Sequence, residues 1–336
     1  MWAEGKVRII DIAADLGVST ATVSNVIHGK TKKISPQTVK RVQQALEQRG
    51  YIPNMAATLL AQNNSRIIGV VVNDHEKYEG RLLMDPFVAG AMNYLSDEIE
   101  KSGWFMMVKK AKNIMQAAKF ASMWNMDGMV LLGFCADEYQ QLRDSIRIPF
   151  VVYDGFLENG SRICNTCIDN RDGGRQMGAY LRELGHHRVL YLADNREWVD
   201  WERYEGLCEG LGYEADYWEI PMESGERQAF YQTRMVELRR YTAAFAASDA
   251  YAVELMGILQ RAGVQIPEDM SVAGFDDGEV CSQIYPPLTS VRQDLQQRAS
   301  TAIRLLKQMK EEPGFSQNVL LPVSLVVRGS TGRLCD

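Results

Sequence analysis

Residues 7–29 read VRIIDIAADLGVSTATVSNVIHG, and this stretch decides the fold of the N-terminal part of the chain. Its apolar residues recur at helical spacing on both sides of Gly17, which interrupts the pattern. We therefore expect one helix before Gly17 and a second helix from Thr20 to about Ile27, with Ser19 as the residue that caps the second helix.

A third helix is predicted from Ser35-Pro36, a cap followed by proline in the first turn, as far as Gly50. The second helix is the informative one, because its valines point inward and leave a small polar face outward. That face consists of Thr20, Ala21, Ser24, Asn25 and His28. A helix of this kind fits a major groove about 12 Å wide, although a merely solvated helix has the same pattern. The Gly-x-Ser turn before the helix and the nearby lysines favour DNA.

The charge of the chain is divided unevenly along its length. Residues 1–66 hold nine Lys or Arg and four Asp or Glu, a net charge of +5, whereas the whole chain has a net charge of −6. The remainder is therefore acidic. Because attraction to phosphate is local and is screened within about 8 Å at physiological salt, a basic module attached to an acidic body is typical of a DNA-binding domain fused to a sensing domain. A basic surface patch without function is the alternative interpretation.

After Arg66 the pattern changes to apolar strand-like runs that alternate with amphipathic helical stretches. The predicted strands are 67–72, 105–108, 128–132, 150–153, 189–192, 243–246 and 271–274. This alternation predicts two sets of parallel strands covered by helices. Ligands of parallel sheets bind beyond the carboxyl ends of the strands. The polar residues that follow the predicted strands there are Asp154, Ser248, Asp249 and Asp276.

Together these motifs resemble the lactose-repressor/galactose-repressor (LacI/GalR) family of bacterial transcription regulators. The resemblance covers nearly the whole chain. It is most specific at Gly17-Val18-Ser19 with Thr22-Val23-Ser24, at GYIPN (50–54), at GFDD (274–277) and at PLTSV (287–291). The chain departs from the family at Asn25, where arginine is usual, and its 30–33 loop is one residue longer than that of the lactose repressor. The resemblance therefore does not identify an operator sequence.

The resemblance implies an α/β two-lobed effector body of the periplasmic-binding-protein-like type I, with an N-terminal all-α helix-turn-helix headpiece. The implied parts are a headpiece (1–50), a hinge helix with its linker (51–66), an N-terminal lobe (67–168 plus 293–322) and a C-terminal lobe (169–292 plus 323–336). Residues 54–61 predict a short alanine-rich helix. Because isolated helices below roughly 12 residues are marginal in water, this hinge should be helical only when something supports it.

By resemblance, the headpiece and hinge would bind double-stranded operator DNA. The residues implied in that contact are Arg8, Ile9, Ser19, Thr20, Ala21, Thr22, Ser24, Asn25, His28, Lys33, Ser35, Thr38, Tyr51, Asn54, Ala57 and Leu60. Among them, Thr20, Ala21 and Asn25 would face bases. Leu60 would act as the wedge that opens a base step in the minor groove, and Ala57 would make the close contact beside it. The alternative is that Leu60 packs on the headpiece.

The resemblance also implies a small-molecule effector between the lobes. The implied contacts are Pro86, Phe87, Asp154, Arg203, Ser248, Asp249, Asp276 and Gln293. We expect Asp154 and Arg203 on one side of the cleft and Asp276 on the other. A guanidinium beside carboxylates suits a neutral, hydroxyl-rich molecule, so a monosaccharide, disaccharide or glycoside is expected, with a purine as the second choice.

Two other classes of function remain open at this stage. A solute-binding receptor that serves a transporter would share the two-lobed body, but the headpiece argues against it. An enzyme is disfavoured because no GxGxxG, GxxxxGK[ST] or GxSxG motif occurs. The pair Cys164 and Cys167 is too isolated to predict zinc, and we expect no cofactor and no metal. A cytoplasmic location, no membrane association and a homodimer reading a near-palindromic operator are also expected.

Overall fold

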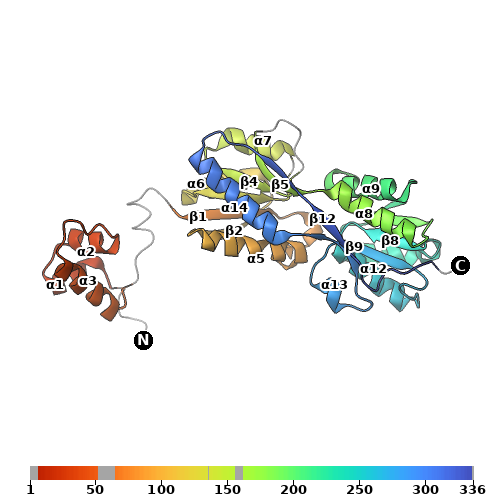
Figure 1. Cartoon of the computed structure of the whole chain (residues 1–336), viewed down its shortest axis with the longest axis horizontal. Helices are drawn as coiled ribbons and strands as arrows, with labels where there is room; N and C mark the ends of the chain where they lie inside the picture. Colours follow the sequence, from red (N-terminus) through yellow and green to blue (C-terminus); the bar gives the residue numbers. More distant parts are fainter. Residues whose placement is uncertain (1–6, 52–64, 135, 156–161, 335–336) are drawn as a thin grey trace. The chain divides into compact units, whose positions relative to one another are not determined.

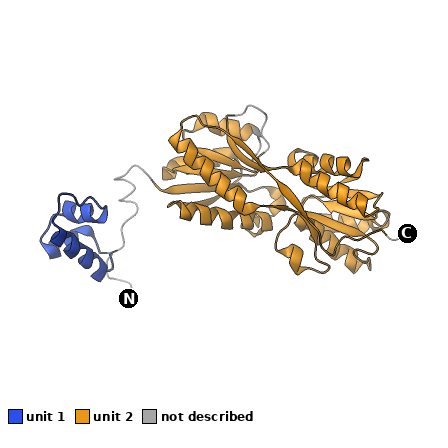
Figure 2. Ribbon diagram, in the orientation of Figure 1, with its two compact units in different colours: residues 1–64 blue, residues 65–336 orange. Residues whose placement is uncertain are grey.

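The computed structural model describes residues 7–51, 65–134, 136–155 and 162–334. The chain forms two compact units, residues 1–64 and residues 65–336, and each is described by itself (Figure 2). Within the described ranges, no helix is both long enough and apolar enough to span a membrane.

The first unit is a small bundle of helices. It contains α1 (Ile9–Leu16), α2 (Thr20–Ile27) and α3 (Pro36–Gln48). Ile12, Val23 and Val42 are fully buried where the helices meet. Gly17 ends α1 with a φ of 62°, a left-handed conformation that glycine adopts without strain. The three helices predicted from the sequence are confirmed.

The second unit begins with a six-stranded parallel sheet, which together with its helices we call the first lobe (Figure 1). The strand order is β11 (Asn318–Leu321), β5 (Cys164–Ile168), β4 (Phe150–Tyr153), β3 (Gly128–Leu132), β1 (Ile67–Asn73) and β2 (Phe105–Ala111). One face packs against α5 (Pro86–Lys101) and α14 (Leu295–Glu311), and the other against α6 (Ile114–Trp124) and α7 (Ala136–Ser145). Two short 3₁₀ helices, η1 (Glu76–Tyr78) and η2 (Leu82–Met84), follow β1.

A second six-stranded sheet forms what we call the second lobe. Its strand order is β12 (Val323–Val326), β10 (Thr289–Gln293), β9 (Ser271–Asp276), β8 (Ala243–Ala246), β6 (Val189–Ala193) and β7 (Asp216–Glu219), and only β12 is antiparallel to its neighbour. One face packs against α8 (Asn170–Glu183) and α9 (Trp198–Leu211). The other face packs against α10 (Ser224–Thr233), α11 (Met235–Leu238), α12 (Asp249–Arg261) and α13 (Val280–Gln283).

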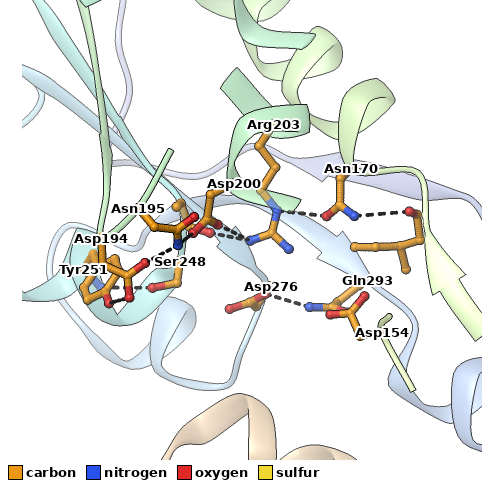
Figure 3. Close-up of polar contacts among 12 residues, drawn as sticks. Asp154, Asn170, Asp194, Asn195, Asp200, Arg203, Ser248, Tyr251, Asp276 and Gln293 are labelled. Atoms are coloured by element: carbon orange, nitrogen blue, oxygen red, sulfur yellow. Dashed lines mark hydrogen bonds and ion pairs between the residues drawn. The ribbon is translucent and has the colours of Figure 1, made fainter. Parts of the chain in front are cut away.

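The chain passes between the two sheets after β5, after β10 and again between β11 and β12. These crossings place the carboxyl ends of β4 and β9, from different lobes, near the same junction (Figure 3). The predicted class, two parallel-rich α/β lobes after an all-α helix-turn-helix headpiece, is confirmed.

Candidate functional sites

The exposed face of α2 is assembled from residues that are close together in sequence. Thr20, Ala21 and Asn25 are exposed, while Val23 and Val26 on the opposite side are buried. Ser24 and His28 are half-buried beside them. The α2 face therefore presents hydroxyl and amide groups with an apolar core behind them, which is the arrangement that base-edge recognition requires.

Two hydroxyl pairs of the headpiece, which the family resemblance implies at phosphates, also cap helices. Ser19 accepts a hydrogen bond from the Thr22 amide at 3.1 Å, and the two hydroxyl oxygens lie 2.8 Å apart. Ser35 and Thr38 repeat this geometry at the start of α3. Both pairs sit at helix N-termini, where unpaired amides and the helix dipole favour anions, so capping and phosphate binding are compatible.

The other headpiece residues have simpler environments. Arg8 is the N-cap of α1 and its amide donates to Asp11 at 2.8 Å. Ile9 and Tyr51 pack at the edge of the small core, whereas Lys33 is exposed. The hinge residues Asn54, Ala57 and Leu60 lie outside the described residues.

At the junction of the lobes, two carboxylates end strands in unusual backbone conformations. Asp154 directly follows β4 and has a φ of 67°, while Asp276 is the last residue of β9 and has a φ of 120°. L-residues rarely adopt these values, and strain of this kind, about 1–3 kcal/mol per residue, is concentrated at functional sites.

Arg203 is held in place on the second lobe by buried partners. Its side chain is 7% exposed; Nε donates to Asn170 Oδ1 at 2.9 Å and Nη1 to the Ala247 carbonyl at 2.6 Å. The guanidinium lies 3.7 Å from the ring centre of Phe275. In Figure 3 it lies between Asn170 and Asp200, with Asp276 and Gln293 below it in the view.

The position of Arg203 depends on a close approach of α8 to α9. A Cβ atom on Gly174 would lie 2.0 Å from the Arg203 carbonyl oxygen, and one on Gly206 would lie 1.9 Å from that of Arg171. Only glycine fits at these two positions, because the opposing atoms belong to the backbone. These glycines thus let the two helices meet and bring Arg203 within reach of Asn170.

A row of polar residues that the sequence did not single out continues from Arg203 along the second lobe (Figure 3). Asn195 donates to Asp194 at 2.7 Å and to Asp200 at 2.8 Å, and Asp200 lies 3.9 Å from Arg203. The Tyr251 hydroxyl donates to Asp194 at 2.7 Å. The row is therefore continuous from α12 to the start of α8.

The two acids of this row have opposite pKa shifts. Burial is the main cause that raises the pKa of Asp200, to about 6. Burial also acts on Asp194, but the charge of Lys77, 4.0 Å away on the first lobe, and hydrogen bonds from Tyr251 and Asn195 outweigh it and lower the pKa. Of the pair, Asp194 is thus the better candidate for a permanent negative charge.

Gln293 and Arg298 connect the two strand-ending carboxylates. Gln293 Nε2 donates to Asp276 Oδ1 at 2.6 Å. Arg298, on α14, donates to Gln293 Oε1 at 2.7 Å and to Asp154 Oδ1 at 2.9 Å. Burial raises the pKa of Asp276 well above its ordinary value, and the nearby Asp249 adds to the shift. We call Asp154, Arg203, Asp276, Gln293 and Arg298 the interlobe site.

The structure corrects one expectation about this site. Arg203 was expected on the same side as Asp154, but it lies on α9, in the second lobe, and thus on the same side as Asp276 on β9. Of the five residues, only Asp154 and Arg298 come from the first lobe. The reason is topological: β4 belongs to the first sheet, whereas α9 follows β6 of the second sheet.

The remaining predicted effector residues have other neighbours. Asp249 is buried and accepts hydrogen bonds from Ser290 Oγ at 2.6 Å, the Gly278 amide at 2.9 Å and Cys281 Sγ at 3.1 Å, so it braces the loop after β9. Burial raises its pKa to about 6. Ser248 caps α12. Neither residue forms a hydrogen bond with the five residues of the interlobe site within the described part of the chain.

Pro86 occupies the first turn of α5, and Phe87 next to it packs against the first-lobe core. The Phe87 ring centre lies 6.0 Å from the Arg298 guanidinium carbon. Cys164 and Cys167 are free thiols, and no group of His, Cys, Asp or Glu within the described ranges is arranged to hold a metal ion.

Two family models match the chain. Residues 8–54 match the model described as bacterial regulatory proteins of the lacI family, and residues 179–331 match a periplasmic binding protein-like domain. A curated relative, the HTH-type transcriptional regulator CelR of Thermobifida fusca, is 29% identical over 335 residues, which cover 95% of this chain and 96% of the relative.

Solved structures agree with these matches. The lac repressor dimer bound to operator and the anti-inducer ONPF superposes with a TM-score of 0.83 at 25% identity, over 98% of this chain and 100% of that chain. The CelR-cellobiose complex superposes with a TM-score of 0.70 at 26% identity, over 97% of this chain and 100% of that chain. The helix-turn-helix, the two-lobed body and the matches over both confirm the resemblance of this chain to the lacI family of bacterial regulatory proteins.

Proposed function

We propose that this protein is an operator-specific transcription repressor whose affinity for DNA is set by a small molecule bound at the interlobe site. The observation that carries the proposal is the combination, in one chain, of an exposed polar recognition helix and a buried polar site at the ends of β4 and β9. A DNA reader needs the first feature and a ligand sensor the second. A transporter-linked receptor has no use for the α2 face.

We infer that the effector is a neutral, hydroxyl-rich molecule, a sugar in the first instance. Arg298 already pairs with Asp154, and Arg203 lies beside Asp200 and Asp276. The two positive charges that could bind an anionic effector are therefore already balanced by carboxylates of the protein. Hydroxyl groups both donate and accept and therefore suit a site that mixes guanidinium, amide and carboxylate groups. The relative CelR was solved with cellobiose, which makes this disaccharide a sensible first probe.

We further propose that the protein works as a homodimer on a near-palindromic operator and that it has no catalytic role. Twofold assembly follows from the way paired recognition helices read two half-sites. The lac repressor structure is a dimer on its operator. Because a bacterial regulator acts where the chromosome is, the cytoplasm is its expected place of action.

The test is a selection of operator sequences from random DNA with the full chain, followed by thermal-shift screening against neutral sugars, sugar phosphates and nucleosides. The proposal expects a near-palindromic consensus and stabilisation by a neutral sugar, with cellobiose tried first. A chain that enriches no sequence is not an operator-binding protein. Stabilisation by sugar phosphates alone would contradict the neutral effector.

A further inference from the structure

Arg298 is a fully buried cation, with 0% of the residue exposed to solvent. It lies one turn into α14, between that helix and the first-lobe sheet, where its neighbours Ala299, Ala302 and Ile303 are apolar core residues. Helices that cover sheets bury aliphatic side chains at such positions, so a guanidinium there requires an explanation other than packing.

The contacts of Arg298 run toward the interlobe site. One guanidinium nitrogen binds Asp154 and the other binds Gln293, which in turn binds Asp276. The result is a hydrogen-bonded series of four side chains, from Asp154 in the first lobe through Arg298 and Gln293 to Asp276 in the second lobe. Both end residues, Asp154 and Asp276, are among the non-glycine residues that have a positive φ angle.

Stability alone does not account for this arrangement. A buried ion pair usually contributes no more to folding than apolar residues of the same volume would. In addition, Arg298 Nε and the hydroxyl of Tyr153, whose ring centre is 5.2 Å from the guanidinium, are buried without a hydrogen-bond partner among the described residues. Unpaired donors of this kind cost about 1–3 kcal/mol each, so the gain must lie in what Arg298 holds in place.

Asp154 and Asp276, which end this series of side chains, each have one carboxylate oxygen that takes no part in it. Arg298 engages Oδ1 of Asp154 and Gln293 engages Oδ1 of Asp276, while Oδ2 of both residues receives no hydrogen bond from the described part of the chain. A ligand that donates hydroxyl protons to both Oδ2 atoms would therefore meet acceptors whose directions are already fixed. Fixing acceptors before binding lowers the entropy cost of association.

We propose that Arg298 is a positioning residue for effector binding, which orients Asp154 directly and Asp276 through Gln293. The inference rests on the proposed function, because it requires a ligand at the interlobe site. Arg298 itself touches no ligand. It joins Asp154 of the first lobe and Asp276 of the second lobe in one hydrogen-bond network. A ligand bound to one of these carboxylates therefore finds the other carboxylate already oriented.

The test compares Arg298→Met, Arg298→Lys and the wild type in the full chain, with cellobiose as the probe. Binding is measured by titration calorimetry, and operator affinity is measured without sugar. Arg298→Met should weaken cellobiose binding about 30-fold, the equivalent of one or two charge-assisted hydrogen bonds, and Arg298→Lys, which keeps the charge, should recover most of this loss. Operator affinity should stay within about 3-fold of the wild type for both variants.

Arg227→Met is the matched control. Arg227 is also a buried arginine and pairs with Glu254, but neither Glu254 nor its carbonyl partners, Pro221 and Met222, belong to the interlobe site. This variant should lose thermal stability and still bind cellobiose with an affinity close to that of the wild type.

A double variant separates positioning from general destabilisation. If Arg298 acts through Asp154, then Arg298→Met should add little to the loss already caused by Asp154→Asn, whereas independent effects would multiply. Full additivity, or normal cellobiose binding by Arg298→Met, overturns the inference and leaves the proposed function standing. A wild-type chain that binds no neutral sugar overturns both.

Discussion

The α2 face and the interlobe site are built in opposite ways. The α2 face takes its residues from one helix and its cap, and the side chains that would read bases, such as Thr20 and Asn25, are exposed. The interlobe site takes its residues from five elements or their ends, buries most of them and bonds them to one another. Changes on the α2 face should therefore act one residue at a time, whereas changes in the interlobe site should act on the network.

The largest expected effect is the loss of the effector response when the network is cut in the second lobe. Arg203→Ala removes hydrogen bonds to Asn170 and to the Ala247 carbonyl. We expect this variant and Asp276→Asn each to weaken effector binding by at least about 100-fold, because each should lose about two charge-assisted hydrogen bonds to the effector, which contribute about 3 kcal/mol together. Operator affinity without effector should be nearly unchanged. Anisotropy titrations with labelled operator, with and without cellobiose, measure both quantities.

Arg171→Ala is the control for this experiment. Arg171 also joins α8 to α9, through Glu205 and Glu209, but its side chain is 51% exposed, so its ion pairs contribute little. A normal effector response in Arg203→Ala or Asp276→Asn would show that the interlobe site is assigned wrongly.

A second effect concerns the pH dependence of stability, which should arise in the second lobe. Because burial raises the pKa of Asp200 to about 6, the folded protein holds this proton more tightly than the unfolded chain does. The free energy of unfolding should therefore fall as the pH rises from about 4 to about 6, by an amount on the order of 1–3 kcal/mol. Asp249 acts in the same direction and in the same range.

Asp200→Asn should flatten this part of the curve, since asparagine does not titrate. Urea denaturation of the wild type and the variant between pH 4 and pH 7 is the measurement. The lowered pKa of Asp194 acts in the opposite direction, but only below about pH 4, outside this range. Equal slopes in the two proteins would show that Asp200 does not titrate as described.

The smallest effects belong to single changes on the headpiece. Asn25→Ala should weaken operator binding by about 1–3 kcal/mol and leave binding to random DNA unchanged, because an amide reads base edges. Lys33→Ala should weaken binding to all sequences and reduce the slope of log affinity against log salt by about 1. Titrations on both DNAs at several salt concentrations distinguish the two. An equal loss of affinity for operator and for random DNA in Asn25→Ala would contradict the proposal that single residues of the α2 face read bases.

The sequence predicts the headpiece well because its signals are local. Ser19, Gly17 and Ser35-Pro36 each act on the adjacent residues, and the structure has its caps and helix ends there. Asp154 and Asp276 were found for a related reason, since both end a strand that is apolar enough to recognise.

The rest of the interlobe site depends on contacts between distant segments. In the run QQRAS, Arg298 looks like a surface residue, and only the packing of α14 on β4 makes it a buried partner of Asp154. Asp194 and Asp200 look like ordinary loop and helix acids for the same reason. One signal in the sequence does point to this contact: Gly174 and Gly178 on α8, and Gly206 and Gly210 on α9, are each four residues apart, a spacing that indicates a close approach of two helices.

The central claim is that the interlobe site and the DNA-binding surface are thermodynamically coupled. The most direct test is to measure cellobiose affinity by calorimetry for the free protein and for the protein saturated with its selected operator, beside operator affinity with and without cellobiose. The account predicts that both affinities change by the same factor, between about 5-fold and 150-fold, since coupling between two sites is reciprocal. Operator-bound and free protein that bind the sugar equally would contradict it.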